Sequence, residues 1–383
     1  MNAFLNNPDL IIVSVGALVG VASSLVGAFL VLRKSSLLSD AISHSVLLGI
    51  ILGYLITGDQ FSPFLVVGAA LAGVATVFLT GLLENSGRVK GDAAIGLVFP
   101  FMFAVGVLLI NVYASNVHID TDAVLLGEIG FVWLDTLTLF GLEVPQALLT
   151  LSVVTLLNAL FVVVFYKELK LTTFDPTLAA ALGFSPTLLY YLLLSLTSVT
   201  AVASFDAVGS VLFVAFVIVP VSAAYLLTDK LWRMILYGML FSVASSVLGY
   251  VSALYFNVSI GGMMALATGV FLTLAFLLSP RYGLISQEAR RRRQGAENAE
   301  RLLLVHLYHH EAEPEEENRL EALRTHLRWS QEKAQRVYER TLDKGFVRKE
   351  PQNPVLELTE VGRARAREVL GPSAQEVRQV GVG

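Results

Sequence analysis

The stretch Arg33–Tyr54, RKSSLLSDAISHSVLLGIILGY, places an aspartate and a histidine within an apolar segment. Asp40 and His44 are four residues apart, so on a helix they share a face and can reach one ion. An ionisable residue inside a membrane span costs at least ~2.5 kcal/mol and indicates a functional role. A carboxylate together with an imidazole suits a first-row divalent metal. A buried ion pair, or a capping aspartate beside a satisfied histidine, would explain the same two residues.

The composition around this stretch is that of a membrane protein. Hydrophobic residues make up 55% and charged residues 15% of the 383 positions, which predicts several membrane spans. Most charges lie after residue 280, so we expect two regions that face different solvents. The absence of cysteine excludes disulfides and thiolate metal sites. No basic residue precedes the first apolar run, so we expect that run to remain as a helix.

Nine apolar runs are each long enough to cross ~30 Å of hydrocarbon. They are residues 10–32, 37–56, 63–83, 92–112, 146–166, 186–204, 206–227, 233–255 and 259–279. The split at Ser204–Phe205–Asp206 is predicted to be either a tight turn or a broken helix. Lysine and arginine before residue 281 fall in alternate loops, which predicts an outer N-terminus and a cytoplasmic C-terminus. They are Arg33, Lys34, Arg88, Lys90, Lys167, Lys170, Lys230 and Arg233.

The loops on the opposite side are acidic. They carry Asp59, His118, Asp120, Asp122, Glu128, Asp135 and Glu143 and contain no lysine or arginine. This charge suits a cation as cargo, with His118, Asp120, Asp122 and Glu128 as candidates at the outer mouth, although a solvated loop explains it equally well. We expect residues 113–145 to form an outer cap or a partly inserted segment. From Lys34, a rise of ~1.5 Å per residue places His44 ~15 Å deep, near the bilayer midplane.

A short helix is predicted in the inner segment 171–185, LTTFDPTLAAALGFS. Asp175 suits the N-cap, Pro176 the first helical position and Gly183 the C-terminal cap. Such a helix could dock on a partner or lie on the membrane surface. The sequence contains no GxxxxGK[ST] phosphate loop. ATP hydrolysis, if it is used, is therefore expected on another polypeptide.

Four stretches resemble the metal-ion ABC importer permeases, which handle manganese, zinc or iron. LRKSSLLSDAISHSVLLGIILGYLITG resembles their second span, GDAAIGLVFPFMFAVGVLLI their fourth span, and FDPTLAAALGFSPTLLYYLL their coupling-helix region. SVTAVASFDAVGSVLFVAFVIVPVSAAYLL resembles the span pair that follows. The resemblance covers nearly all of residues 8–280 and keeps the family's order. It implies an all-α polytopic fold of the type II ABC importer class in a bacterial inner membrane.

The same resemblance implies partners and residue roles. It implies a homodimeric permease with two ATPase subunits and an extracytoplasmic metal-binding protein, and no bound cofactor besides the transported ion. Asp40 and His44 would handle the metal. The residues that would dock on the ATPase are Phe174, Asp175, Pro176, Leu178, Ala179, Leu182 and Gly183. Zinc-type members often carry a further histidine where this chain has Phe99–Pro100–Phe101, so manganese is favoured, with zinc or iron as alternatives.

The predicted domains are a permease at residues 1–280, a basic linker at 281–295, a cytoplasmic domain at 296–371 and a tail at 372–383. Helix–helix–helix and a two-stranded wing in the third region predict a small α+β winged helix-turn-helix. Its sequence resembles the DNA-binding part of the iron-dependent repressors. From residue 281 the 19 basic and 17 acidic residues nearly cancel, which favours a protein-contact or regulatory module over DNA binding. His309 and His310 are interpreted as a solvated helix end.

Two other functions remain open at this point. One is a stand-alone secondary transporter or channel with a regulatory tail, which would need no ATPase. The other is a membrane-tethered transcriptional sensor, which would bind DNA through residues 296–370 with a steep salt dependence.

Overall fold

A computed structural model describes residues 5, 7–59, 63–113, 127–139, 142–311, 326–349 and 355–371. The chain divides into two compact units, Met1–Leu284 and Ile285–Gly383. The first unit holds the apolar runs and the second holds the charged region.

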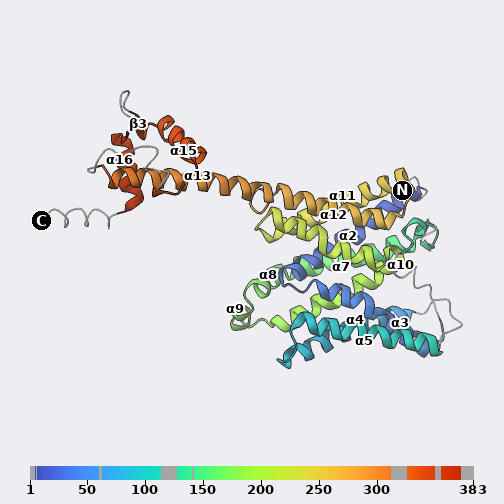
Figure 1. The fold of residues 1–383 in the computed structure, drawn as a ribbon. Helices are drawn as coiled ribbons and strands as arrows, with labels where there is room; N and C mark the ends of the chain where they lie inside the picture. The colour runs from blue at the N-terminus through green and yellow to red at the C-terminus, as the bar shows by residue number, and fades with distance from the viewer. Residues whose placement is uncertain are drawn as a thin grey trace. The chain divides into compact units, whose positions relative to one another are not determined.

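The first unit is a bundle of long helices (Figure 1). Within the described residues, nine segments are long and apolar enough to cross a membrane. Eight helices supply them, because α10 contains two. These helices are α2 (Pro8–Leu32), α3 (Leu37–Thr57), α4 (Pro63–Asn85), α5 (Gly91–Tyr113), α7 (Gln146–Val164), α10 (Pro186–Leu227), α11 (Leu231–Phe256) and α12 (Ile260–Leu278). The predicted multispanning helical fold is confirmed.

The break between the sixth and seventh spans lies later than the sequence predicts. Helical structure continues through Ser204, whose hydroxyl donates to the Thr200 carbonyl, and the helix breaks at Gly209, with φ 72° and ψ 171°. Only glycine adopts this backbone conformation without strain. A Cβ on Gly127 would lie 2.1 Å from the Val208 carbonyl carbon and 2.2 Å from the Gly209 nitrogen. The segment that begins at Gly127 therefore packs directly onto α10 where the helix is broken.

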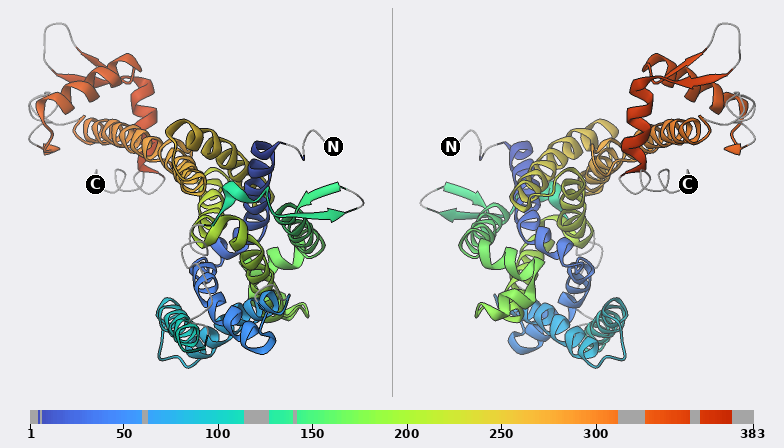
Figure 2. Two further views of the ribbon diagram at one scale, coloured as in Figure 1. Left: turned by 90° about the vertical axis from the view of Figure 1, so that its right-hand side faces the viewer. Right: turned by 90° about the vertical axis from the view of Figure 1, so that its left-hand side faces the viewer.

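Small residues allow the helices of the bundle to approach closely. α3 packs against both α4 and α5, while α10 contacts α2, α3, α4 and α7; Figure 2 shows α3, α4 and α5 gathered on one flank. At the α3–α4 crossing, Gly49 and Gly68 face each other with no room for a side chain. Ser24 and Ser242 share a buried hydrogen bond of 2.9 Å between α2 and α11. Close backbone contact between small residues is typical of helix packing in lipid.

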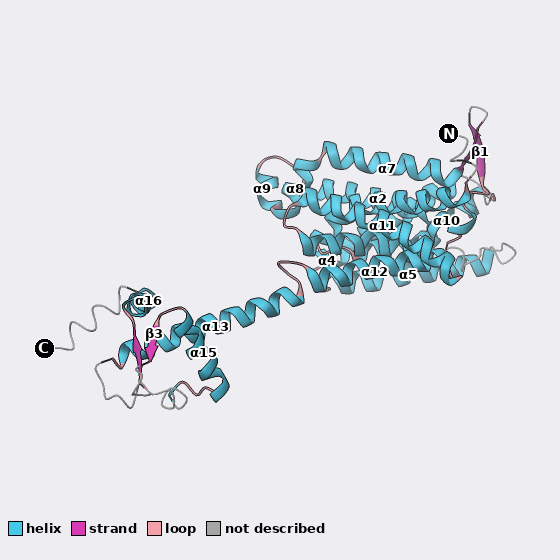
Figure 3. Cartoon of the chain, turned by 90° about the horizontal axis from the view of Figure 1, so that it is seen from above, coloured by secondary structure: helices cyan, strands magenta, loops and turns pink. Residues whose placement is uncertain are grey.

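The two ends of the bundle carry different short elements. At one end lie the 3₁₀ helix η1 (Ile129–Phe131) and the antiparallel strands β1 (Thr136–Leu139) and β2 (Leu142–Pro145), with Thr136 opposite Pro145. At the other end lie α8 (Tyr166–Phe174) and α9 (Pro176–Ala181) (Figure 3). The described residues of the predicted outer cap thus form short elements, not a further span.

The second unit has its own hydrophobic core. Its described elements are α13 (Leu284–His309), α15 (Gln331–Asp343), β3 (Val347–Lys349), β4 (Leu356–Leu358) and α16 (Glu360–Leu370). Strands β3 and β4 pair antiparallel. The core includes Leu303, Leu304, Leu307, Trp329, Val337 and Leu358.

Most of the predicted linker, residues 281–295, lies in α13 and is helical. Residues 312–325 and 350–354 of the predicted domain, and all of the predicted tail at 372–383, fall outside the described residues. The winged-helix resemblance therefore stays a prediction.

Candidate functional site

Asp40 and His44 lie in the first two turns of α3. The Nε2 atom of His44 is 3.5 Å from Oδ1 of Asp40, with 32% of the histidine side chain and 42% of the aspartate side chain exposed. The N-cap of α3 is Ser36, so Asp40 does not occupy the capping position. The pair is therefore an ion pair or a set of two ligands, and both side chains are partly exposed.

Two aromatic side chains of α5 form a wall beside His44. The Phe99 ring stacks on the imidazole with 5.7 Å between ring centroids, and the Phe103 ring meets it edge-on at 6.0 Å. These contacts restrict how the imidazole can turn. They also place an apolar ring at Phe99, where a further histidine could otherwise face the pair. The sequence did not reveal this wall, because it depends on the packing of α5 against α3.

Within the described residues, one copy of the chain provides two potential metal ligands here, Asp40 and His44. No group of three histidine, aspartate or glutamate side chains within the described ranges could hold a metal ion. First-row divalent ions take four to six ligands. An ion held by Asp40 and His44 would therefore need further ligands.

His44 lies nearer to the start of α3 than a residue count from Lys34 suggests. Residues 33–36 form a turn, and α3 begins at Leu37. His44 is seven residues into the helix, ~10 Å from its start at ~1.5 Å per residue. The predicted depth of ~15 Å counted the turn as helix. The pair thus lies between the Leu37 end of α3 and its middle.

The inner-loop helix α9 has the predicted caps and an apolar exposed surface. The Asp175 carboxylate accepts from the backbone nitrogen of Leu178 at 2.9 Å, Pro176 occupies the first turn, and Gly183 has φ 88°. Ala179 is buried, while Phe174, Leu178 and Leu182 are 60%, 47% and 61% exposed. The segment therefore holds three large apolar side chains away from the bundle on a rigid turn.

Arg33 connects the turn before α3 to the region of α9. Its Nη2 donates to Thr172 Oγ1 at 2.7 Å, and its Nε donates to Thr173 Oγ1 at 3.1 Å. Its guanidinium also lies 5.4 Å from the ring centroid of Tyr190 on α10. The sequence places Arg33 in an inner loop but does not reveal these partners, because they lie some 140 positions further along the chain.

Of the four outer-mouth candidates, Glu128 is placed and the other three are not. Glu128 precedes η1 and follows Gly127, which packs on the break in α10. His118, Asp120 and Asp122 lie outside the described residues. Glu128 is thus the residue next to Gly127, which contacts the break in α10.

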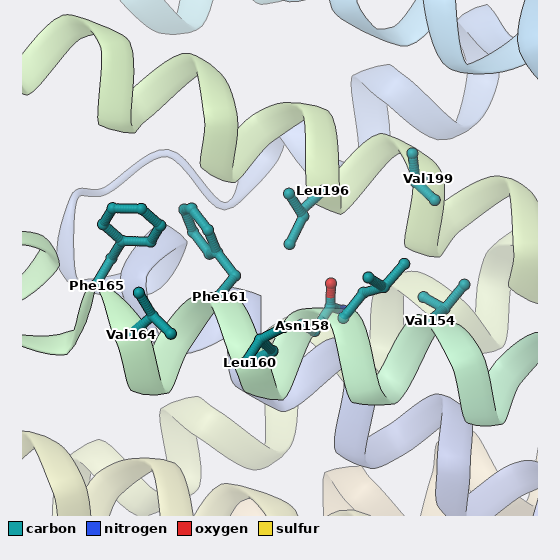
Figure 4. A pocket seen from close by; sticks show the side chains of 9 residues that line it. Val154, Asn158, Leu160, Phe161, Val164, Phe165, Leu196 and Val199 are labelled. Carbon is teal, nitrogen blue, oxygen red and sulfur yellow. The ribbon is translucent and has the colours of Figure 1, made fainter.

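An apolar cavity of about 430 Å³ lies between α7 and α10 (Figure 4). Its one polar lining residue is Asn158, whose amide donates to the Ala22 carbonyl at 3.2 Å and to Thr200 Oγ1 at 2.8 Å. The amide thereby joins α7 to α2 and α10. With its other lining residues apolar, this cavity offers no set of cation ligands.

Comparison with known proteins gives consistent matches. Residues 10–279 match the ABC 3 transport family. The chain is 48% identical over 280 residues to the manganese transport system membrane protein MntD of Bacillus subtilis, covering 73% of this chain and 95% of that protein. It is 44% identical over 360 residues to the zinc transport system membrane protein TroD of Treponema pallidum, covering 93% of this chain and 98% of that protein.

The TroD match extends beyond the helix bundle. Residues 1–284 are 284 of 383 positions, about 74% of the chain, so a match to 93% includes much of the second unit. Among solved structures, PsaBC from Streptococcus pneumoniae in complex with Fab aligns with a TM-score of 0.63 and 28% identity. That alignment covers 75% of this chain and 98% of the other.

Proposed function

Because the chain belongs to the ABC 3 transport family, we propose that it is the membrane-spanning subunit of an ATP-driven importer of divalent metal ions, with manganese as the favoured cargo. The observation that carries the proposal is the pair of Asp40 and His44 on one face of α3. Relatives named as manganese and zinc transport proteins support it. Zinc or iron as the cargo is the alternative.

The metal site is completed by a second copy of the chain. Each copy contributes one carboxylate and one imidazole, so two copies supply four ligands to an ion on their shared axis. A mixed oxygen and nitrogen set is compatible with manganese, iron and zinc, whereas additional imidazoles would favour zinc. Phe99, stacked on His44, adds no ligand, and this favours manganese.

ATP hydrolysis takes place on a separate cytoplasmic subunit that docks on α9. Phe174, Leu178 and Leu182 provide an exposed apolar surface, and the Asp175 cap and Gly183 hold its shape. Burial of such side chains at an interface stabilises it by ~1.5–3 kcal/mol each. A helix lying on the membrane surface would account for the same exposure.

Movement at α9 reaches the metal pair through Arg33. The guanidinium holds Thr172 and Thr173 immediately before Phe174, and its own backbone forms the turn that leads into α3. Displacement of α8 and α9 by the ATPase therefore shifts the start of the helix that carries Asp40. This gives a physical connection between the nucleotide state of the partner and the access of the ion to its site.

The orientation follows from the charges of the loops. Basic residues of alternate loops place α9 and the second unit in the cytoplasm and the N-terminus outside. The ion is delivered by an extracytoplasmic binding protein to the acidic outer segment, where Glu128 lies next to Gly127 on the α10 break. We place the chain in the inner membrane of a bacterium.

The test is uptake into proteoliposomes that contain the permease, its ATPase and the metal-binding protein. Manganese, zinc and iron are offered in competition, with and without ATP. We expect uptake that needs ATP and prefers manganese. Uptake that follows an ion gradient without ATP would instead indicate a stand-alone secondary transporter. A matched ATPase variant that binds but does not hydrolyse ATP provides the control.

A further inference from the structure

Three histidines of the second unit lie together. His306 and His310 are four residues apart near the end of α13, and His326 lies shortly before α15. The ring centroids are 4.4 Å apart for His306 and His310, 5.7 Å for His306 and His326, and 6.4 Å for His310 and His326. Two segments separated in the sequence thus bring three imidazoles to one place.

His309 does not belong to this group. It is exposed, and its ring meets Tyr308 with 6.4 Å between centroids. One residue along a helix turns the side chain by ~100°, so His309 and His310 point in different directions. Of the two adjacent histidines that stand out in the sequence, only His310 therefore belongs to the group that the fold brings together.

The spacing of the three rings matches that of imidazoles on one ion. With a metal–nitrogen distance of about 2.0–2.1 Å, ring centroids in a tetrahedral site lie about 5.2 Å apart. The observed separations of 4.4–6.4 Å bracket this value. As the described residues stand, no group of three such side chains could hold an ion, so binding requires the three rings to turn. Rotation about the Cβ–Cγ bonds turns the nitrogens while the ring centres move little.

We propose that His306, His310 and His326 form a binding site for a first-row divalent ion of the zinc type. Imidazole nitrogen suits such ions better than it suits manganese, and three histidines with a fourth position for water is a known zinc arrangement. His306 and His310 are half-buried and His326 is exposed, so the site is accessible from solvent. It is separate from Asp40 and His44, which belong to the first unit.

The ion would join two parts of the second unit. His310 directly follows the last residue of α13, and His326 lies three residues before Trp329, which is 8% exposed and belongs to the core of this unit. A ligand that connects both stabilises the folded unit by mass action.

The experiment is a titration of the full-length purified chain with Zn²⁺, and separately with Co²⁺, whose visible absorption reports coordination by nitrogen. Asp40→Ala and His44→Ala are introduced together in every sample, so that the proposed transport site does not contribute. The variants are H306Q with H310Q, and H326Q alone, which lies outside α13. The matched control is H309Q, which removes a neighbouring imidazole.

One ion per chain is expected in the background protein and in H309Q. Loss of one first-sphere imidazole is expected to weaken binding at least about tenfold, because even outer-shell changes cost 10–100-fold. Unchanged binding in both H306Q/H310Q and H326Q overturns the site, and so does an equal loss in H309Q, which would indicate non-specific binding. Because transport is not measured, failure here leaves the proposed function untouched.

Discussion

At Gly49 the backbones of α3 and α4 come so close that one added methyl group has no room. A Cβ at Gly49 would lie 2.2 Å from the Gly68 carbonyl oxygen, and a Cβ at Gly68 would lie 2.4 Å from the Gly49 oxygen. Both partners are backbone atoms, which cannot turn away as a side chain can. The helix that carries Asp40 and His44 is therefore fixed against α4 by the absence of side chains at these two positions.

Gly49→Ala is expected to destabilise the bundle by about 1–3 kcal/mol, because the helices must move apart to accept the methyl group. Gly96→Ala in α5 is the matched control, since a Cβ there meets nothing within 4 Å. The measurement is the apparent melting temperature of each purified variant in detergent. Equal melting temperatures for the two variants would contradict the close contact of α3 and α4.

Single residues of the candidate site could be predicted where the information is local. The i, i+4 spacing of Asp40 and His44 and the N-cap at Asp175 depend on neighbouring residues, and both appear as expected. The Phe99 wall and the Thr172 and Thr173 partners of Arg33 could not be predicted. They arise from packing between helices, and no local pattern specifies which side chains will meet.

Among the elements, α9 and α10 have the most direct consequences for transport. α9 is a short, well-capped helix whose large apolar side chains face away from the bundle. α10 is a long helix broken at Gly209, where Gly127 of the outer segment packs. α9 exposes large apolar side chains at one end of the bundle, and the break in α10 contacts the segment that begins at Gly127.

Leu182→Ala is expected to lower ATP-driven uptake about 10–100-fold, because it removes ~1.5–3 kcal/mol of apolar burial at the proposed ATPase interface. Leu302→Ala is the control, because Leu302 lies on α13 and its side chain is exposed to a similar extent, 51% against 61% for Leu182. ATP hydrolysis and uptake are measured in the same proteoliposomes. Wild-type rates in Leu182→Ala would favour a helix that only lies on the membrane.

The positions of the spans were predictable, because apolar runs of this length are rare outside membrane-spanning helices. The break in α10 was predicted at Ser204–Phe205–Asp206 and lies at Gly209. Polar Ser204 and Asp206 made that point resemble a turn, but the helix continues through Ser204, whose hydroxyl donates to the Thr200 carbonyl. The contact with Gly127 comes from a segment some 80 residues earlier, beyond any local pattern.

At the scale of the whole molecule, the two units differ in the side chains that they bury. The first buries small and apolar side chains between helices. The second has a compact core and a nearly buried glutamate, Glu300, whose carboxylate lies 2.7 Å from Lys344 Nζ and 3.4 Å from Arg340 Nε. The match to TroD extends into this second unit, whereas the match to MntD spans 280 residues and 95% of that protein.

The proposed orientation predicts which loops face the outside. The sequence contains no cysteine, so a single introduced thiol can be labelled without background. Thr136→Cys in β1 is expected to react with an impermeant thiol reagent in intact cells. Ser86→Cys, between α4 and α5, is expected to react only after the membrane is permeabilised. The opposite pattern would invert the topology and place α9 outside.

Metal uptake by the assembled complex with Asp40→Ala and with His44→Ala tests the proposed ion site most directly. Asp92→Ala controls for the loss of a first-turn carboxylate on another span, and His309→Ala controls for the loss of an imidazole. Assembly is checked by co-purification of the ATPase. Both site variants are expected to assemble and lose uptake, while both controls transport like the wild type. Full uptake in the two site variants would contradict the proposed ion site and show that Asp40 and His44 form only a structural ion pair.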